Sequence, residues 1–160
     1  MGLALRAIAR LCRFYDHSAM MPVSALGLDI GRRRIGVAGC DGTGLIATGL
    51  TTLQRRSFAD LVADLQQIVS DRQVQVLVVG LPLTMDGKEG FQARQVRKVA
   101  GGLGQALGLP VIYVDERLSS VEAEQLMRAA GHSVSHEKAL IDRKAAAIIL
   151  QRWLDERRPS

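Results

Sequence analysis

Acidic residues occur in three places where the sequence pattern calls for apolar ones. Asp29 lies within the apolar run ALGLDI. Asp115 and Glu116 end the apolar run VIYV, and Asp142 lies in a helical segment rich in alanine and isoleucine. A carboxylate in such surroundings is costly unless a cation or hydrogen-bond donors compensate its charge. Acids from distant parts of a chain suit Mg²⁺ or Mn²⁺, which prefer oxygen ligands and promote attack of water on phosphodiesters. The acids therefore predict a divalent-metal-dependent hydrolase.

The direction of each acid follows from the element that carries it. Asp142 shares a helical stripe with apolar residues, and these are Ala145, Ala146, Ile149 and Trp153. This spacing predicts that Asp142 faces the sheet. Strand alternation directs only one of Asp115 and Glu116 toward the site, and the pattern leaves both open. Any one acid is equally consistent with a helix cap or a structural ion pair, whereas three together favour the metal site.

Basic residues cluster beside the acids and suggest a polyanionic partner. The formal net charge is +5, although residues 1–20 contribute +2 of it. The candidates for contacts with phosphate groups are Arg32, Arg34, Arg94, Arg97, Lys98 and Arg117, and further basic neighbours of the acids are Arg33, Arg143 and Lys144. A single such residue is more often a solvated surface charge, but clustering favours phosphate contacts. The aromatic content of 4% argues against base stacking, so recognition of backbone shape is expected.

The elements that position these residues follow from apolar periodicity. Apolar runs predict strands at 24–31, 34–41, 44–53, 74–83 and 111–116, and helical spacing predicts helices at 57–71, 90–107, 120–130 and 137–156. Ser57 and Asp60 form a capping pair for the first of these helices. Short connections between the first three strands predict an antiparallel meander, and the later strands alternate with helices. The order β-β-β-α-β-α-β-α-α predicts an α/β sandwich around a mixed five-stranded sheet.

Composition sets limits on the class of protein. The 160 residues, 48% of them hydrophobic, fit one domain, which we expect to span 24–160 after a dispensable or disordered extension at 1–23. No apolar run approaches the ~18 residues that a membrane span needs. The 2 cysteines are too few for a disulfide framework, which favours the cytoplasm.

Four segments together resemble a known family. They are LGLDIGRRRIGVA, VVGLPLTMDGKEGFQARQVRKVA, VIYVDERLSSVEAE and IDRKAAAIILQRWL. In this order they resemble the signature blocks of the YqgF/RuvX family, described as Holliday junction resolvases or pre-16S rRNA nucleases. The resemblance implies an RNase H-like fold, with catalytic and metal-binding acids at Asp29, Glu116 and Asp142. Many resolvases of this fold carry a further acid at the end of the fourth strand, where this chain reads VVGLPL.

The expected function is metal-dependent endonucleolytic hydrolysis of structured nucleic acid, at the ends of pre-16S rRNA in ribosome biogenesis. The alternatives are resolution of branched DNA at a Holliday junction and a non-catalytic RNA-binding factor for ribosome maturation. The segment DIGRRRIGVA also resembles the phosphate-binding hairpin of actin-like ATPases and sugar kinases, but those enzymes close two such domains around a nucleotide. A junction substrate favours a homodimer, and trimming of RNA needs only a monomer.

Overall fold

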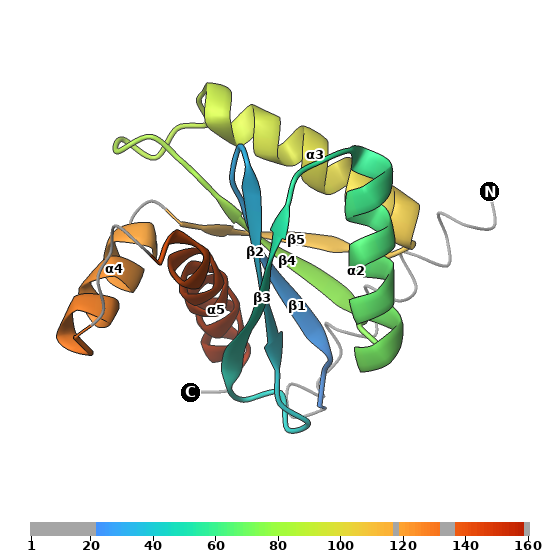
Figure 1. Cartoon of the computed structure of the whole chain (residues 1–160), viewed down its shortest axis with the longest axis horizontal. Coiled ribbons are helices and arrows are strands. Elements are labelled where there is room, and N and C mark those ends of the chain that lie inside the picture. Colours follow the sequence, from blue (N-terminus) through green and yellow to red (C-terminus); the bar gives the residue numbers. More distant parts are fainter. Residues whose placement is uncertain (1–21, 117–118, 132–136, 159–160) are drawn as a thin grey trace.

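The computed structural model describes residues 22–116, 119–131 and 137–158 (Figure 1). The strands are β1 (Ala25–Ile30), β2 (Arg34–Cys40), β3 (Ala47–Gln54), β4 (Val76–Leu81) and β5 (Val111–Asp115). The helices are α2 (Phe58–Arg72), α3 (Phe91–Leu107), α4 (Ser119–Ala129) and α5 (Lys138–Arg157). The predicted order of elements is confirmed, and the predicted ends are shifted by only a few residues.

The described strands form one mixed sheet with the order β3-β2-β1-β4-β5. β1, β2 and β3 form the predicted antiparallel meander, with a register shift between Val37 and Ala38. β4 lies parallel to both β1 and β5, as expected for strands joined through helices. β1 is therefore the central strand, and the carboxyl ends of the three parallel strands meet at one edge of the sheet.

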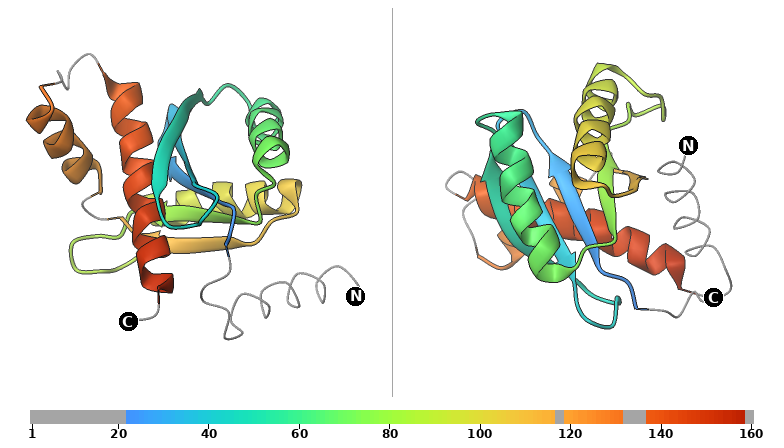
Figure 2. Two further views of the ribbon diagram at one scale, coloured as in Figure 1. Left: turned by 90° about the horizontal axis from the view of Figure 1, so that it is seen from below. Right: turned by 90° about the vertical axis from the view of Figure 1, so that its right-hand side faces the viewer.

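Helices cover both faces of this sheet (Figure 2). On one face, apolar residues of β1, β2 and β4 pack against α2 and α3 around Leu28, Leu65 and Leu103. On the other face, small and branched residues pack against α5 around Val78 and Ile149. α4 packs on α5, through Met127 and Ala145. This gives the predicted α/β sandwich.

Local sequence explains where α2 begins. Ser57 is its N-cap, and the Ser57 hydroxyl accepts a hydrogen bond from the backbone N–H of Asp60 at 3.1 Å. Leu61, Leu65 and Val69 then recur at helical spacing and are buried. The capping pair predicted from sequence is confirmed.

α5 approaches the sheet closely because glycines leave room for it. At Gly36 in β2, a Cβ atom would lie 1.9 Å from the carbonyl oxygen of Asp142. At Gly27 in β1, a Cβ atom would lie 2.7 Å from Cβ of Leu150. Both distances are far inside van der Waals contact, so only glycine allows the helix to lie where it does.

Some sequence predictions fall on residues that the structure does not describe. These are most of the predicted extension at 1–23, and Arg117. Among the described residues, no helix is both long and apolar enough to cross a membrane.

Candidate functional site

Asp29 lies one residue before the carboxyl end of the central strand β1. Strand alternation puts it on the same face as Gly27, which contacts α5. Its partner in the register of β2 is Gly36, the glycine beneath Asp142. Asp29 therefore faces the amino-terminal turns of α5, at the edge where the parallel strands end. This edge is where open α/β sheets usually place their sites.

Glu116 directly follows β5 and is directed to the same place. Only 9% of the residue is exposed, and its backbone N–H donates to the carbonyl of Leu81 at 3.2 Å. A Cβ atom at Gly80 would lie 2.8 Å from the Glu116 Cδ atom, so Gly80 makes room for this carboxyl. The side chains of Glu116 and Asp29 share a hydrogen bond. Asp115 is exposed, and its backbone carbonyl accepts a hydrogen bond from Arg152. Of the two acids that the sequence left open, Glu116 is the one beside Asp29.

Asp142 lies in the second turn of α5 and faces Asp29 across Gly36. Its carboxylate accepts a hydrogen bond from the Arg34 guanidinium at 2.7 Å, in a half-buried ion pair. Its negative charge also contributes to the pKa of Asp29. The three acids predicted from sequence are thus neighbours at one end of the sheet.

Burial raises the pKa of Asp29 to about 6. The hydrogen bond from Glu116 lowers this pKa, and the nearby charge of Asp142 raises it again by a smaller amount. The carboxyl group of Asp29 thus lies in surroundings that disfavour its negative charge, and it lies close enough to Glu116 and Asp142 for both to act on its pKa.

The donor set fits a hard divalent cation, although the present geometry does not form a complete coordination site. Within the described ranges, no group of three or more His, Cys, Asp or Glu residues is close enough to hold a metal ion. The Asp142 carboxylate is directed to Arg34 instead. Asp29 and Glu116 nevertheless offer adjacent, buried oxygen atoms of the kind that Mg²⁺ and Mn²⁺ bind. Asp142 would complete the set by exchanging Arg34 for the ion.

A cavity of about 450 Å³ opens beside Glu116. It lies at the carboxyl ends of the parallel strands, where Ile30, Gly31 and Pro82 line one side. A second cavity of about 220 Å³ lies at the start of α2 and shares Arg32 and Arg55 with the first. Both volumes are open to solvent, so Glu116 lies beside a surface that carries Arg32 and Arg55.

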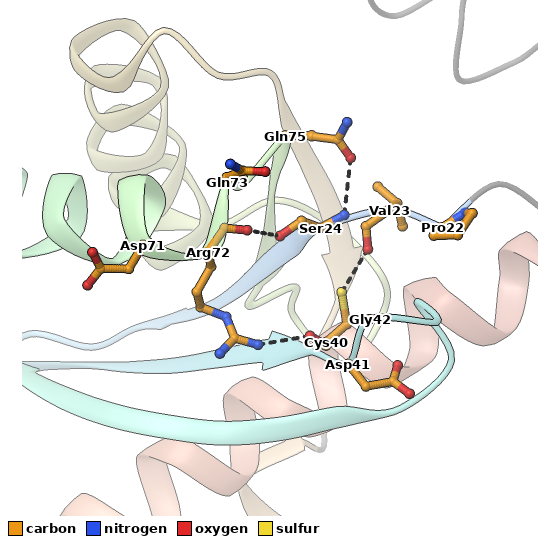
Figure 3. Close-up of a pocket in the computed structure, with 10 residues that line it drawn as sticks. All are labelled: Pro22, Val23, Ser24, Cys40, Asp41, Gly42, Asp71, Arg72, Gln73 and Gln75. Atoms are coloured by element: carbon orange, nitrogen blue, oxygen red, sulfur yellow. Dashed lines mark hydrogen bonds between the residues drawn. The ribbon is translucent and has the colours of Figure 1, made fainter.

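A further cavity of about 470 Å³ lies at the opposite end of β1 (Figure 3). Val23, Cys40 and Arg72 line it, and the Cys40 thiol donates a hydrogen bond to the Val23 carbonyl at 3.0 Å. The Arg72 guanidinium donates to the Cys40 carbonyl at 2.8 Å. These contacts tie β1, β2 and α2 together. None of the three acids lines this cavity, so we assign the chemistry to the other end of the sheet.

The basic residues predicted to bind substrate have different surroundings. Arg32 is exposed and lines both cavities near the acids. Arg34 holds Asp142, and Arg97 pairs with Glu89 through its Nε atom at 2.8 Å. Arg94 and Lys98 are exposed on α3. Among the predicted contacts that the structure describes, Arg32 lines the two cavities described above.

Residues of these two cavities that were not proposed from sequence as part of a site include Arg55, Arg56, Phe58 and Phe91. Arg55 and Arg56 stand together directly after a predicted strand, which is the signal that could have drawn attention to them. The exposure of the two phenylalanine rings has no such signal, because apolar residues at the start of a helix are normally read as core.

Comparison with solved structures identifies the fold. RuvC of Thermus thermophilus, solved with a Holliday junction substrate, matches with a TM-score of 0.52 and 13% identity, over 84% of this chain and 95% of that one. The Fowlpox virus resolvase, solved with Holliday junction DNA, matches with a TM-score of 0.51 and 10% identity, over 84% and 98%. The mixed five-stranded sheet with its flanking helices is therefore the RNase H-like fold of RuvC-type resolvases.

The family follows from closer similarity. A family model described as "RuvX: Holliday junction resolvase" matches residues 23–156. A protein of Trichormus variabilis is 65% identical over 136 residues, which is 85% of this chain and 90% of the relative. A protein of Crocosphaera subtropica is 58% identical over 141 residues, covering 88% and 99%. Both relatives carry the name "Putative pre-16S rRNA nuclease". The chain belongs to the RuvX family, and its class is that of a nuclease.

Proposed function

We propose that this chain is a Mg²⁺- or Mn²⁺-dependent endonuclease that hydrolyses phosphodiester bonds in structured RNA, at the ends of pre-16S rRNA. The observation that carries the proposal is the buried hydrogen bond between the carboxyl groups of Asp29 and Glu116, beside a cavity lined by Arg32 and Arg55. Acids in surroundings that disfavour their charge are poorly suited to a purely structural role. They are well suited to oxygen ligation of a cation that phosphate groups approach.

Each side chain has a distinct task in this reaction. Asp29, Glu116 and Asp142 would hold the ion, which supplies activation of water and stabilisation of the leaving oxygen when it is bound. Gly80 and Gly36 leave room for the carboxyl groups against the sheet. Arg34 keeps Asp142 beside Asp29 in the absence of the ion.

Basic residues at the mouth of the cavity would orient the substrate. Arg32 and Arg55 offer guanidinium groups that bind phosphate oxygen atoms through paired N–H donors. Such contacts fix the register of a nucleic-acid strand but carry no sequence information. The cut position would then depend on the shape of the substrate.

The relatives named above support pre-16S rRNA as the substrate, since they are 58–65% identical to this chain. A four-way DNA junction is the second candidate, because the family model carries the name of that activity. An rRNA substrate fits a cytoplasmic protein and needs only a monomer, whereas a two-fold symmetric junction favours a homodimer.

The test compares the wild-type protein with Asp29→Asn on two substrates, an RNA that spans a pre-16S end and a four-way DNA junction, with Mn²⁺ and with chelator. We expect the wild type to cut the RNA only with metal and Asp29→Asn to be slower by orders of magnitude. Asp64→Asn is the matched control, because it removes a carboxylate on α2 outside the acid cluster. A Mn²⁺-dependent rise in Tm for the wild type, absent in Asp29→Asn, reports metal binding without turnover.

Each other outcome has a distinct meaning. Wild-type cleavage by Asp29→Asn would refute the metal-nuclease assignment. Cleavage of the junction alone would favour the DNA substrate. RNA binding without cleavage, and without a Mn²⁺-dependent rise in Tm, would favour the non-catalytic RNA-binding factor.

A further inference from the structure

The two cavities near the acids adjoin each other, because Arg32 and Arg55 line both of them. We call this pair of cavities the arginine groove. It runs from Glu116 and Phe91 at one end to Arg56 and Phe58 at the other. Its floor is built from the carboxyl end of β1 and the segment that joins β3 to α2. The larger cavity is therefore lined by Glu116, one member of the carboxyl pair, whereas none of the three acids lines the smaller one.

Arg55 is held in position by the turn that follows β1. Its guanidinium Nη1 donates to the carbonyl of Gly31 at 2.8 Å, and its backbone N–H donates to the carbonyl of Arg33 at 2.9 Å. A guanidinium group has five N–H donors, so most of those on Arg55 stay available. Within the part of the chain that the structure describes, Arg32 and Arg55 form no ion pair with a carboxylate. Both can therefore bind phosphate oxygen atoms without breaking an existing salt bridge.

The aromatic residues of the groove are unusually exposed. Phe91 is 63% exposed at the start of α3, and Phe58 is 50% exposed at the start of α2. Leaving a phenylalanine ring in water forgoes the favourable free energy of burying it. Part of the Phe58 ring lies against Gly102 of α3, where an added Cβ atom would be 3.2 Å from Cζ. This contact supports the ring at the groove and leaves much of its surface open.

Alternating aromatic and arginine side chains are typical of a surface that binds unpaired nucleotides. Bases stack on aromatic rings, and phosphate groups contact the guanidinium groups between them. A duplex cannot use such rings without disruption, because its bases already stack on one another. The low aromatic content of the sequence led us to expect recognition by backbone shape. The placement of two phenylalanine residues in one basic groove favours the opposite.

We infer that the arginine groove binds an unpaired stretch of RNA, with bases on Phe91 and Phe58 and phosphates on Arg32 and Arg55, and delivers that strand to the acids. This inference rests on the proposed function and specifies its substrate as a single-stranded segment. A structured RNA with a single-stranded flank fits this arrangement. The flank would enter the groove, and the folded part of the RNA would contact other surfaces of the protein.

Binding measurements on the full chain test this inference without requiring cleavage. Fluorescence anisotropy is recorded in chelator with a short labelled single-stranded RNA and with the same RNA annealed to its complement. The variants are Phe58→Ala and Phe91→Ala. Their control is Leu126→Ala, which removes a side chain that is 57% exposed on α4, outside the groove. Arg55→Ala is compared with Arg128→Ala, which removes an exposed charge on the same helix as Leu126.

We expect each phenylalanine variant to weaken single-strand binding about 5- to 150-fold, which corresponds to about 1–3 kcal/mol of base stacking. Duplex binding should change little. Arg55→Ala should reduce the slope of log Kd against log salt by about 0.7, the value for one phosphate contact on a single strand. The phenylalanine variants should leave this slope unchanged, since no phosphate contact is lost.

Two results would overturn the inference: single-strand binding of both phenylalanine variants at wild-type strength, or equal losses for single strand and duplex. Phe91→Leu and Phe58→Leu keep an apolar side chain and remove only the ring, so they replace the alanine variants if those fail to fold. Failure of the nuclease proposal is separate. It would appear as absence of metal-dependent cleavage, whatever the binding data show.

Discussion

Removal of the Asp29 charge should make the metal-free protein more stable at neutral pH. Burial raises the pKa of Asp29 from 3.8 to about 6. A carboxyl group with a raised pKa binds protons more tightly in the folded state than in the unfolded state. Its contribution to stability is therefore complete below about pH 4 and is lost as the pH rises through 6. Above that range the wild-type protein must keep a charge in surroundings that disfavour it.

The rise in pKa sets the size of the effect. The difference between 3.8 and about 6 corresponds to about 3 kcal/mol of unfolding free energy above pH 7. Asp29→Asn removes this penalty but weakens the hydrogen bond to Glu116, whose loss costs about 1 kcal/mol. The net gain should be about 2 kcal/mol. For a protein of this size, that gain raises Tm by about 4–8 °C.

The assay is thermal unfolding of both proteins in chelator across about pH 4 to 8. The difference in Tm should be small at the acid end and should grow through about pH 6. Asp64→Asn, which removes a carboxylate on α2 outside the acid cluster, is the matched control. A variant that is less stable than the wild type at neutral pH, or an advantage independent of pH, would refute the argument that burial strains Asp29.

Three further predictions concern the residues around the acids. Gly36→Ala should destabilise the protein by about 3 kcal/mol or more in urea unfolding, because the added Cβ atom would lie 1.9 Å from the carbonyl oxygen of Asp142. Gly42→Ala is the control and should leave stability unchanged, because no atom lies within 4 Å of a Cβ atom at that position. Asp41→Asn should lower Tm at neutral pH, because hydrogen bonds from Thr43 and two backbone N–H groups lower the pKa of Asp41; this difference should disappear as the pH falls below its ordinary value of 3.8. Arg34→Gln should weaken the ion pair with Asp142 and so reduce cleavage. It should leave the salt dependence of RNA binding nearly unchanged, whereas loss of a phosphate contact would reduce that dependence.

The fold was predictable because its signals are local. Alternating and continuous apolar runs identified each strand, and helical spacing behind Ser57 identified α2 with its cap. Short connections predicted the antiparallel meander, and the intervening helices predicted parallel pairing. Each of these signals depends on neighbours along the chain, so no knowledge of distant contacts was required.

The site was predictable only in part. Asp29 and Asp142 were found because acids in apolar stretches are conspicuous in a single sequence. The choice between Asp115 and Glu116 needed the exact end of β5, which alternation cannot supply. The salt bridge of Arg34 to Asp142 joins residues far apart in sequence, so that arginine was read as a contact for substrate. Phe91 lines a cavity that exists only in the folded protein, so nothing in the sequence indicates that its ring is exposed.

The glycines explain how the fold tolerates acids that reduce its stability. Asp142 can lie over β2 only because Gly36 has no side chain, and the Glu116 carboxyl occupies the space that a Cβ atom at Gly80 would need. A larger residue at either position would clash with its neighbours and would separate the oxygen atoms that a cation must bind together. Selection for stability alone would favour neutral replacements for the acids. The close approach of α5 and the raised pKa of Asp29 are two consequences of one requirement, which is to hold several carboxyl groups within reach of the same ion.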